Sequence, residues 1–389
     1  MTDYEKLRSI LHKQGMDYKA AGTFVQKLEE DEENFSIPQE KKIWALRYGF
    51  FPGRVELYNL NNGNREKYLP DYHYFMLHPL NHHFKIWIND KLTLKYILNN
   101  DNFKSIMPAY YAYVENDGSY TYLMDCPQEI AKDDVFLWNL LEYKRNLVLK
   151  PNSSASGGFG FIRLEKRGAE VYENNIKIDG ERFNNIRDSI RNYVITEYVY
   201  QHTDMAYIWP QSECTLRVIM CKKPKKRFDE DRWTCLVSFA RFGTSISGGT
   251  SNLVAGGVGI GFDYETGLYS DTCLRYKKFC EDGAWRLYEH PDSKVKWQGL
   301  RIPHWDLIKK KISELCQYIS SLSYLGLDIV VTQEDMKILE INTLPALDYA
   351  QVISGPAMRN KELRAFFESK GINDFNGKDL LDAYLQSQK

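Results

Sequence analysis

Two carboxylates and an amide near the C-terminal end of the sequence have the spacing of a metal site. Asp328 and Glu340 lie in two apolar runs, 325–331 and 336–341, joined by a short polar turn in the pattern of a β-hairpin. If the turn is centred in that polar stretch, antiparallel pairing sets Asp328 opposite Glu340. The strand period of two then puts Asn342 on the same face.

Like charges directly opposite each other in a sheet repel, so such a pair is costly among Val, Ile and Leu unless a cation lies between the two carboxylates. Oxygen ligands with no Cys or His nearby suit Mg²⁺. The pattern therefore predicts a magnesium site at Asp328, Glu340 and Asn342. A half-exposed hairpin whose acids face water is an equally open interpretation.

Residues 146–163, NLVLKPNSSASGGFGFIR, join a lysine to a loop rich in glycine and serine. A predicted strand ends at Lys150-Pro151, and a second begins at Phe161 after the loop. Glycine permits close approach, so backbone N–H groups of such a loop can lie against phosphate oxygens. The loop is neither a P-loop nor a dinucleotide fingerprint, because those motifs need a helix where this sequence has a strand. The alternative is a flexible turn without a ligand.

Charged residues interrupt three further apolar runs. Glu197 and Arg217 each lie inside a strand-like run, and Arg241 precedes a Gly/Ser/Asn loop, 243–257, that contains Asn252. Each could be a satisfied structural residue. A guanidinium in an apolar strand needs an anion, however, so two arginines beside a glycine loop favour an anion site.

The other predicted elements position these residues. They are an amphipathic helix or helix pair over 4–30, short strands and loops over the aromatic, turn-rich 42–75, a helix from Lys91 with Asp90 as N-cap, a helix over 305–321, and a helical tail from 356.

Composition bounds the class of protein. The 389 residues suggest two or three domains, and 43% hydrophobic and 26% charged residues with a net charge of -1 describe a soluble globular chain. This balance does not favour nucleic acid as a partner.

The seven cysteines are an odd number with no CxxC pair, which argues against a disulfide framework and against a zinc site. The N-terminus lacks the apolar core of a signal peptide, and no stretch is long enough to span a bilayer. A cytoplasmic location is expected.

The residues that could take part in binding or catalysis occur in a definite order along the chain. Along the chain they are Lys91, Lys150 with its glycine loop, Glu197, Arg217, Arg241, Asp328 and Glu340-Ile341-Asn342. This ordered set resembles the ATP-grasp superfamily. Within the superfamily, the sequence is most similar to the sugar-transfer-associated group. The similarity runs from about Trp44 to Leu347 and includes WALRYGF, INDK, LKP…GGFGF, EYVYQH, TLRV, FARFG and LEINTLP.

The resemblance implies roles for these residues. It implies that Lys91 and Lys150 contact the ATP phosphates, and that a mobile loop covers these phosphates through Ser153, Ser154, Gly157, Gly158 and Gly160. It also implies that Glu197, with the backbone of Tyr198 and Val199, holds adenine. Asp204 would reach the ribose. It places one or two Mg²⁺ on Asp328, Glu340 and Asn342, and the phosphoryl group on Arg217 and Arg241. Ser251 precedes Asn252 where related sequences often have an acid, which puts a role for that loop in doubt.

The expected fold is α+β: an ATP-grasp fold of two α+β lobes that grip ATP, with an N-terminal region of helices and short strands. The expected parts are an N-terminal helical and pre-ATP-grasp region over 1–88, a small lobe with the glycine-rich loop over 89–200, a large lobe with the metal site over 201–355, and a helical tail over 356–389.

The resemblance implies an ATP- and Mg²⁺-dependent carboxylate–amine ligase that acts through an acyl phosphate. The absence of a recognisable Ser/His/Asp or Cys/His arrangement fits chemistry that relies on positioning and charge neutralisation. The substrates would be a small carboxylate and an amine, sugar-linked (a uronic acid or polysaccharide precursor) or an amino acid. The alternatives are a kinase of the same fold and a non-catalytic nucleotide-binding module.

Overall fold

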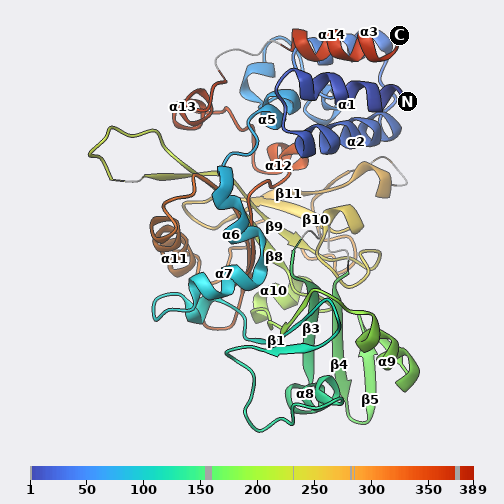
Figure 1. Cartoon of the computed structure of the whole chain (residues 1–389). Coiled ribbons are helices and arrows are strands. Elements are labelled where there is room, and N and C mark those ends of the chain that lie inside the picture. The colour runs from blue at the N-terminus through green and yellow to red at the C-terminus, as the bar shows by residue number, and fades with distance from the viewer. Residues whose placement is uncertain (1, 154–159, 231, 281–282, 284, 373–376) are drawn as a thin grey trace.

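A computed structural model describes residues 2–153, 160–230, 232–280, 283, 285–372 and 377–389 of the chain. It comprises an N-terminal helical region and two seven-stranded antiparallel sheets (Figure 1). Both chain ends lie in the helical region, at the top of the view, and the second sheet is drawn between this region and the first sheet.

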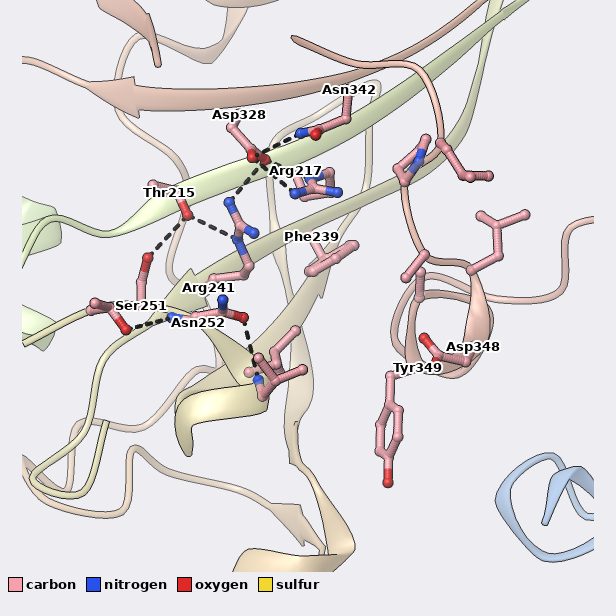
Figure 2. A pocket seen from close by; sticks show the side chains of 18 of the residues that line it. Thr215, Arg217, Phe239, Arg241, Ser251, Asn252, Asp328, Asn342, Asp348 and Tyr349 are labelled. Carbon is pink, nitrogen blue, oxygen red and sulfur yellow. Dashed lines mark hydrogen bonds and ion pairs between the residues drawn. The ribbon is translucent and has the colours of Figure 1, made fainter. Parts of the chain in front are cut away.

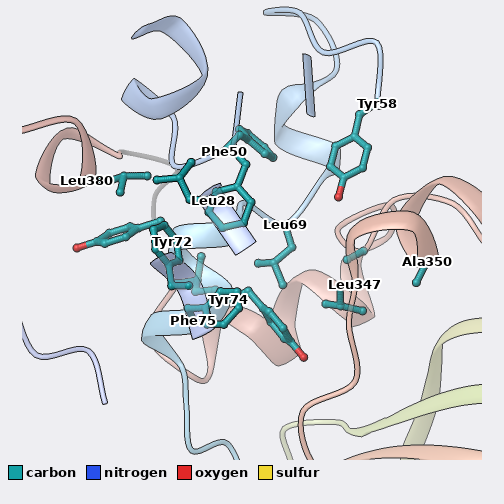
Figure 3. Packing of buried hydrophobic residues seen from close by; sticks show 14 of the residues in the cluster. Leu28, Phe50, Tyr58, Leu69, Tyr72, Tyr74, Phe75, Leu347, Ala350 and Leu380 are labelled. Carbon is teal, nitrogen blue, oxygen red and sulfur yellow. The ribbon is translucent and has the colours of Figure 1, made fainter. Parts of the chain in front are cut away.

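The helical region combines the two ends of the sequence in one core. Its helices are α1 (Asp3–Lys13), α2 (Tyr18–Asn34), α3 (Gln39–Arg47), α4 (Arg54–Leu57) and α5 (Asp71–Met76), with α12 (Asp348–Ile353), α13 (Lys361–Glu368) and α14 (Lys378–Ser387). Figure 3 shows Leu28 and Phe50 from the first part packed near Leu380 from the last. The first helix begins with a capping box between Thr2 and Glu5, as helix N-termini favour.

The expectation of short strands over residues 42–75 was wrong, because the described elements there are α3, α4, α5 and the 3₁₀ turn Arg65–Lys67. The aromatic residues that suggested strands, Phe50, Phe51, Tyr72 and Phe75, are buried in the helical core. Aromatic preference for strands reflects packing surface more than backbone conformation, and this core offers such a surface to helices.

A buried arginine ties α2, α4 and α5 together. Arg54 donates from Nε and Nη2 to Asp71 Oδ1 at 3.2 and 3.0 Å, and from Nη1 to Asp31 Oδ1 at 3.1 Å. The three side chains are 6%, 11% and 3% exposed, respectively. The second oxygens accept from the backbone N–H groups of Phe51 and Gly53, so both carboxylates are satisfied.

Arg54→Met is expected to lower the free energy of unfolding by about 3–5 kcal/mol, because it leaves two buried carboxylates without their cation. Urea unfolding measures this effect. Arg47→Met, at an exposed position of α3, is the control and should change stability by less than about 0.5 kcal/mol. Equal unfolding midpoints for the two variants would contradict a stabilising role for the Arg54 cluster.

The first sheet has the strand order β2-β1-β7-β3-β4-β5-β6. Its strands are β1 (Tyr110–Val114), β2 (Tyr120–Tyr122), β3 (Asn146–Pro151), β4 (Ile162–Arg167), β5 (Glu170–Glu173), β6 (Ile176–Ile178) and β7 (Tyr193–Glu197). Helices α8 (Phe136–Lys144) and α9 (Gly180–Ser189) share its buried core. The pairing of β3 with β4 confirms the predicted strands on either side of the glycine-rich loop.

The second sheet has the order β12-β11-β10-β9-β8-β13-β14. Its strands are β8 (Thr215–Lys222), β9 (Trp233–Phe242), β10 (Val258–Phe262), β11 (Tyr269–Arg275), β12 (Arg286–Leu287), β13 (Tyr324–Val331) and β14 (Met336–Asn342). Helix α11 (Trp305–Tyr318) buries Ile308, Ile312 and Leu315 in the core of this sheet. Helix α10 (Thr203–Ile208) contributes Met205 and Ile208 to the same core.

The predicted register of the C-terminal hairpin is confirmed. Asp328 of β13 is paired with Glu340 of β14, and on its other side β13 pairs with β8, where Asp328 faces Arg217. All eight residues of β13 are buried. A fully buried strand flanked on both edges holds its carboxylate in one place.

The expected cap of α7 (Lys91–Leu98) is also confirmed, since Asp90 accepts from the Thr93 backbone N–H at 2.7 Å. Helix α6 (Lys85–Asn89) precedes it, and Leu94 and Leu98 pack into the core of the second sheet. The division at residues 89, 201 and 356 stays a prediction. Helix α7, which was expected in the small lobe, packs in the core of the second sheet. The segments 1–88 and 356–389 share one core.

None of the seven cysteines forms a disulfide in the part of the chain that the structure describes. Among the described helices, none combines the length and apolar character needed to cross a bilayer.

Candidate active site

One cavity of about 960 Å³ collects most of the residues that the sequence singled out. Its wall includes the end of β7, the strands β8 and β9, the hairpin β13–β14, and the start of α7. Helix α2 and the start of α12 also contribute side chains. The cavity therefore reaches from the two sheets to the N-terminal helical region.

The three predicted oxygen ligands lie together on the hairpin, and Figure 2 shows two of them, Asp328 and Asn342. Asn342 Nδ2 donates to Asp328 Oδ2 at 3.2 Å and to Glu340 Oε1 at 3.1 Å. Asp328 is buried, whereas the Glu340 side chain is 34% exposed. Glu340 thus presents its carboxylate to the cavity, and Asp328 lies beneath it.

Both predicted arginines bind the buried carboxylate. Arg217 donates from Nε to Asp328 Oδ1 at 2.5 Å and from Nη2 to Oδ2 at 2.8 Å, and Arg241 Nη2 lies 2.8 Å from Oδ1. Burial by itself would raise the pKa of Asp328, but the two guanidinium groups outweigh it and lower the pKa to about 2. With Asn342, four donors surround a carboxylate that has about four acceptor positions.

Two lysines complete the cluster. Lys91 Nζ lies 3.6 Å from Glu340 Oε2, and Lys150 Nζ donates to the Leu339 carbonyl at 3.3 Å. Burial, and then the charge of Lys91, lower the pKa of Lys150 to about 8, so it is still mainly protonated at pH 7. Four cations against two carboxylates leave a positive excess, which suits a polyanion such as a triphosphate.

The segment expected at adenine also lines the cavity. Glu197 ends β7, and Tyr198 and Val199 follow it. Glu197 Oε1 accepts from the Ala109 backbone N–H at 2.9 Å and lies 3.6 Å from Lys337 Nζ. These contacts fix Glu197 at the point where the chain leaves the first sheet.

Several predicted residues are not brought to this cluster. Asp204 is in the first turn of α10, outside the described cavity wall, with its side chain 72% exposed and 3.7 Å from His202 Nδ1. Ser153 and Gly160 mark the two ends of the glycine-rich loop. Ser154, Gly157 and Gly158 lie outside the described residues.

Three residues that the sequence analysis did not assign to the site belong to its wall. Thr215 Oγ1 accepts from Arg241 Nε at 2.9 Å and lies 3.1 Å from Ser251 Oγ, so the loop whose role was in doubt helps to hold an arginine. Glu213 lies near Tyr198, and burial raises its pKa. In the sequence, only the position of Thr215 at the start of the TLRV motif pointed to it. Glu213 lies before that strand, where no strand or helix period marks it.

The oxygen donors of this cluster fit Mg²⁺, which would share Asp328 with the two arginines. In the described part of the chain no three His, Cys, Asp or Glu side chains could hold a metal ion, so a site here depends on the Asn342 amide with Asp328 and Glu340. All are hard oxygen donors, as Mg²⁺ prefers. Glu340 is accessible, but a cation would compete with the arginines for Asp328.

Comparison with solved structures gives remote matches to a synthetase and a ligase. N5-carboxyaminoimidazole synthetase from Staphylococcus aureus, complexed with ADP, is 10% identical, with 72% of this chain and 52% of that chain covered and a TM-score of 0.38. D-alanine–D-alanine ligase from Bacillus anthracis is 14% identical, with 77% and 67% covered and a TM-score of 0.33. The chain thus spans about half the length of the synthetase, 52%.

No curated protein matches the sequence. Residues 77–366 match the family described as sugar-transfer associated ATP-grasp. The matched segment is well over half of the 389 residues and contains every residue of the cluster around Asp328. The chain therefore belongs to the sugar-transfer associated ATP-grasp family.

Proposed function

We propose that this protein is an ATP- and Mg²⁺-dependent ligase that joins a carboxylate to an amine through an acyl phosphate. The observation that carries the proposal is the meeting of cations and oxygen ligands in one cavity. The cations are Lys91, Lys150, Arg217 and Arg241, and the oxygen ligands are Asp328, Glu340 and Asn342.

ATP would lie between the two sheets. Glu197 and the backbone of Tyr198 and Val199 would hold adenine at the end of β7, and Lys91 and Lys150 would bind the phosphates. The loop between Ser153 and Gly160 would cover them. This arrangement puts the γ phosphate beside the arginines of β8 and β9.

Asp328, Glu340 and Asn342 would hold Mg²⁺. The ion would neutralise charge on the phosphates and align them for transfer. Because Asp328 already has two guanidinium partners, we expect Glu340 to be the main ligand and Asp328 to be shared between cation and arginines.

The first step would form the acyl phosphate. A carboxylate oxygen of the substrate attacks the γ phosphorus, the bond to the β–γ bridging oxygen breaks, and ADP leaves with the electron pair. Arg217 and Arg241 offer paired N–H donors that match both carboxylate and phosphate oxygens, so they would hold the group in transfer. No enzyme nucleophile is required.

In the second step the substrate amine, after losing a proton to water, attacks the acyl carbon. The bond from that carbon to the phosphate oxygen breaks, and phosphate leaves with the electron pair and takes up the second proton that the nitrogen loses. The family name suggests sugar-linked substrates, such as a uronic acid or a polysaccharide precursor, and an amino acid fits the same chemistry.

Oxygen transfer tests this sequence of steps. With an ¹⁸O-labelled carboxylate from a panel of uronic acids and amino acids, together with amines, ATP and Mg²⁺, we expect one label to appear in the released phosphate. The amide product should have the mass of acid plus amine minus water. Unlabelled phosphate would exclude an acyl phosphate.

The same measurement separates the alternatives. A kinase would release ADP without inorganic phosphate and add a phosphoryl group to one substrate, with no need for an amine. A non-catalytic nucleotide-binding module would bind ATP and release no ADP with any pair in the panel.

A further inference from the structure

The cavity continues beyond the arginines to an end that the family match only partly covers. One side of this end is α2, outside residues 77–366, and it contributes Thr23, Gln26, Lys27, Glu30 and Asn34. The other side is the start of α12 with the segment 276–278. Figure 2 shows Asp348 and Tyr349 across from Arg217 and Arg241, with Phe239 drawn between them.

Part of the charge at this end is already neutralised. Arg54 is bound by Asp31 and Asp71 as described above. Lys277 Nζ lies 2.5 Å from Glu56 Oε1. The Lys277–Glu56 pair is neutral, whereas Arg54 with its two carboxylates keeps one net negative charge.

Four further charged side chains line this end of the cavity: Lys27, Lys278, Glu30 and Asp348. In the part of the chain that the structure describes, none of them has a hydrogen bond with an oppositely charged side chain. Asp348 Oδ2 forms a long ion pair with Arg54 Nη2 at 4.0 Å, without a hydrogen bond. Glu30 accepts only from the neutral Gln26 amide.

These groups line the same cavity and act on one another electrostatically. Lys27 is the strongest of the charges that lower the pKa of Asp348 against the effect of burial. Glu30 acts on Tyr276, whose ring stacks on Tyr349 with centroids 3.8 Å apart. Two cations, two anions and an aromatic pair thus line one space.

We propose that this end of the cavity binds the amine substrate, and that this substrate is an amino acid in its zwitterionic form. The proposal rests on the ligase function proposed above. The ligand carboxylate would be held by Lys27 and Lys278, and its ammonium group by Asp348 and Glu30.

The balance of charge is the reason for a zwitterion. A simple amine would bring no anion to Lys27 and Lys278, and a simple acid would bring no cation to Glu30 and Asp348, whereas a zwitterion offers a partner of opposite charge to both sets. The position also suits a nucleophile, because the acid substrate is expected at the arginines across Phe239. Helix α2 would then select the acceptor, from outside the matched family segment.

Binding measurements on the full chain test the proposal without requiring turnover. With Mg²⁺ and a non-hydrolysable ATP analogue present, each of the twenty standard amino acids is tested singly by thermal shift, and binders are titrated by calorimetry. Each binder is compared with its N-acetyl form, which lacks the ammonium group, and its amide, which lacks the carboxylate. We expect both derivatives to bind at least about tenfold more weakly.

The variants Lys27→Ala and Asp348→Asn should each weaken binding of that amino acid about tenfold or more and leave the affinity for the ATP analogue unchanged. Lys19→Ala, at an exposed position of the same helix α2, is the matched control and should bind like the parent. The inference is overturned if no amino acid binds, if the derivatives bind equally well, or if neither variant weakens binding.

Failure here is distinguishable from failure of the ligase proposal. Labelled phosphate and an amide product formed from an amine without a carboxylate would overturn the zwitterion site alone. Amino acid binding that depends on Lys27 and Asp348, without ADP release, would overturn the ligase function alone.

Discussion

Glu340→Gln is expected to lower turnover about 100-fold or more while the fold stays intact. The change removes one negative charge from the side chain that is most accessible to Mg²⁺ and keeps its shape. Loss of one group that stabilises transition-state charge typically costs about 10²–10³ in rate. The fold should survive because the side chain is 34% exposed and its cationic contact, Lys91 Nζ, is as far away as 3.6 Å.

The measurement is turnover at saturating Mg²⁺, alongside the melting temperature of each variant. Glu334→Gln removes the same charge from an exposed position in the turn of the same hairpin, and it should leave both quantities unchanged. Near-normal turnover of Glu340→Gln at saturating Mg²⁺ would remove Glu340 from the proposed metal site.

The hairpin shows how far local pattern can go. Strand alternation and the position of one turn were enough to place Asp328 opposite Glu340 with Asn342 on the same face, and the structure has this register. The arginine contacts could not be read in the same way. Arg217 is 111 residues before its partner Asp328, and their contact depends on β8 pairing with β13, a long-range choice that local periodicity does not contain.

The N-terminal region shows the opposite case. Its aromatic residues and turn signals suggested strands, yet a shared core with the C-terminal helices made these segments helical. Neither that core nor the approach of α2 to the start of α12 leaves a signal in a window of a few residues. The side chains that line the far end of the cavity, such as Lys27 and Asp348, were therefore not predicted.

The two arginines should respond differently to replacement by lysine, because their contacts differ. Arg217 uses two nitrogens on the two oxygens of Asp328. Arg241 uses Nη2 on the same carboxylate and Nε on Thr215, and Nη1 has no partner among the described residues, so it can meet a ligand. Lysine has a single point of charge and reproduces neither pattern.

Arg241→Lys is expected to lower turnover about 100-fold, the scale found when one charge-stabilising donor is removed. Its melting temperature should stay close to that of the parent, because Arg217 still neutralises Asp328. Arg217→Lys is expected to lower both turnover and the melting temperature. The melting temperature should fall by about 2–4 °C for each kcal/mol of unfolding free energy lost with the bidentate pair.

Measurements of thermal stability, ATP affinity and turnover on both variants show whether each arginine takes part in phosphoryl transfer or only stabilises the sheet. If Arg241→Lys lowered the melting temperature and kept its turnover, Arg241 would serve only to hold Asp328. The phosphoryl group would then have to be held by Lys91, Lys150 and Arg217. In that case Arg217, which already uses two nitrogens on Asp328, would have to bind the acid substrate as well.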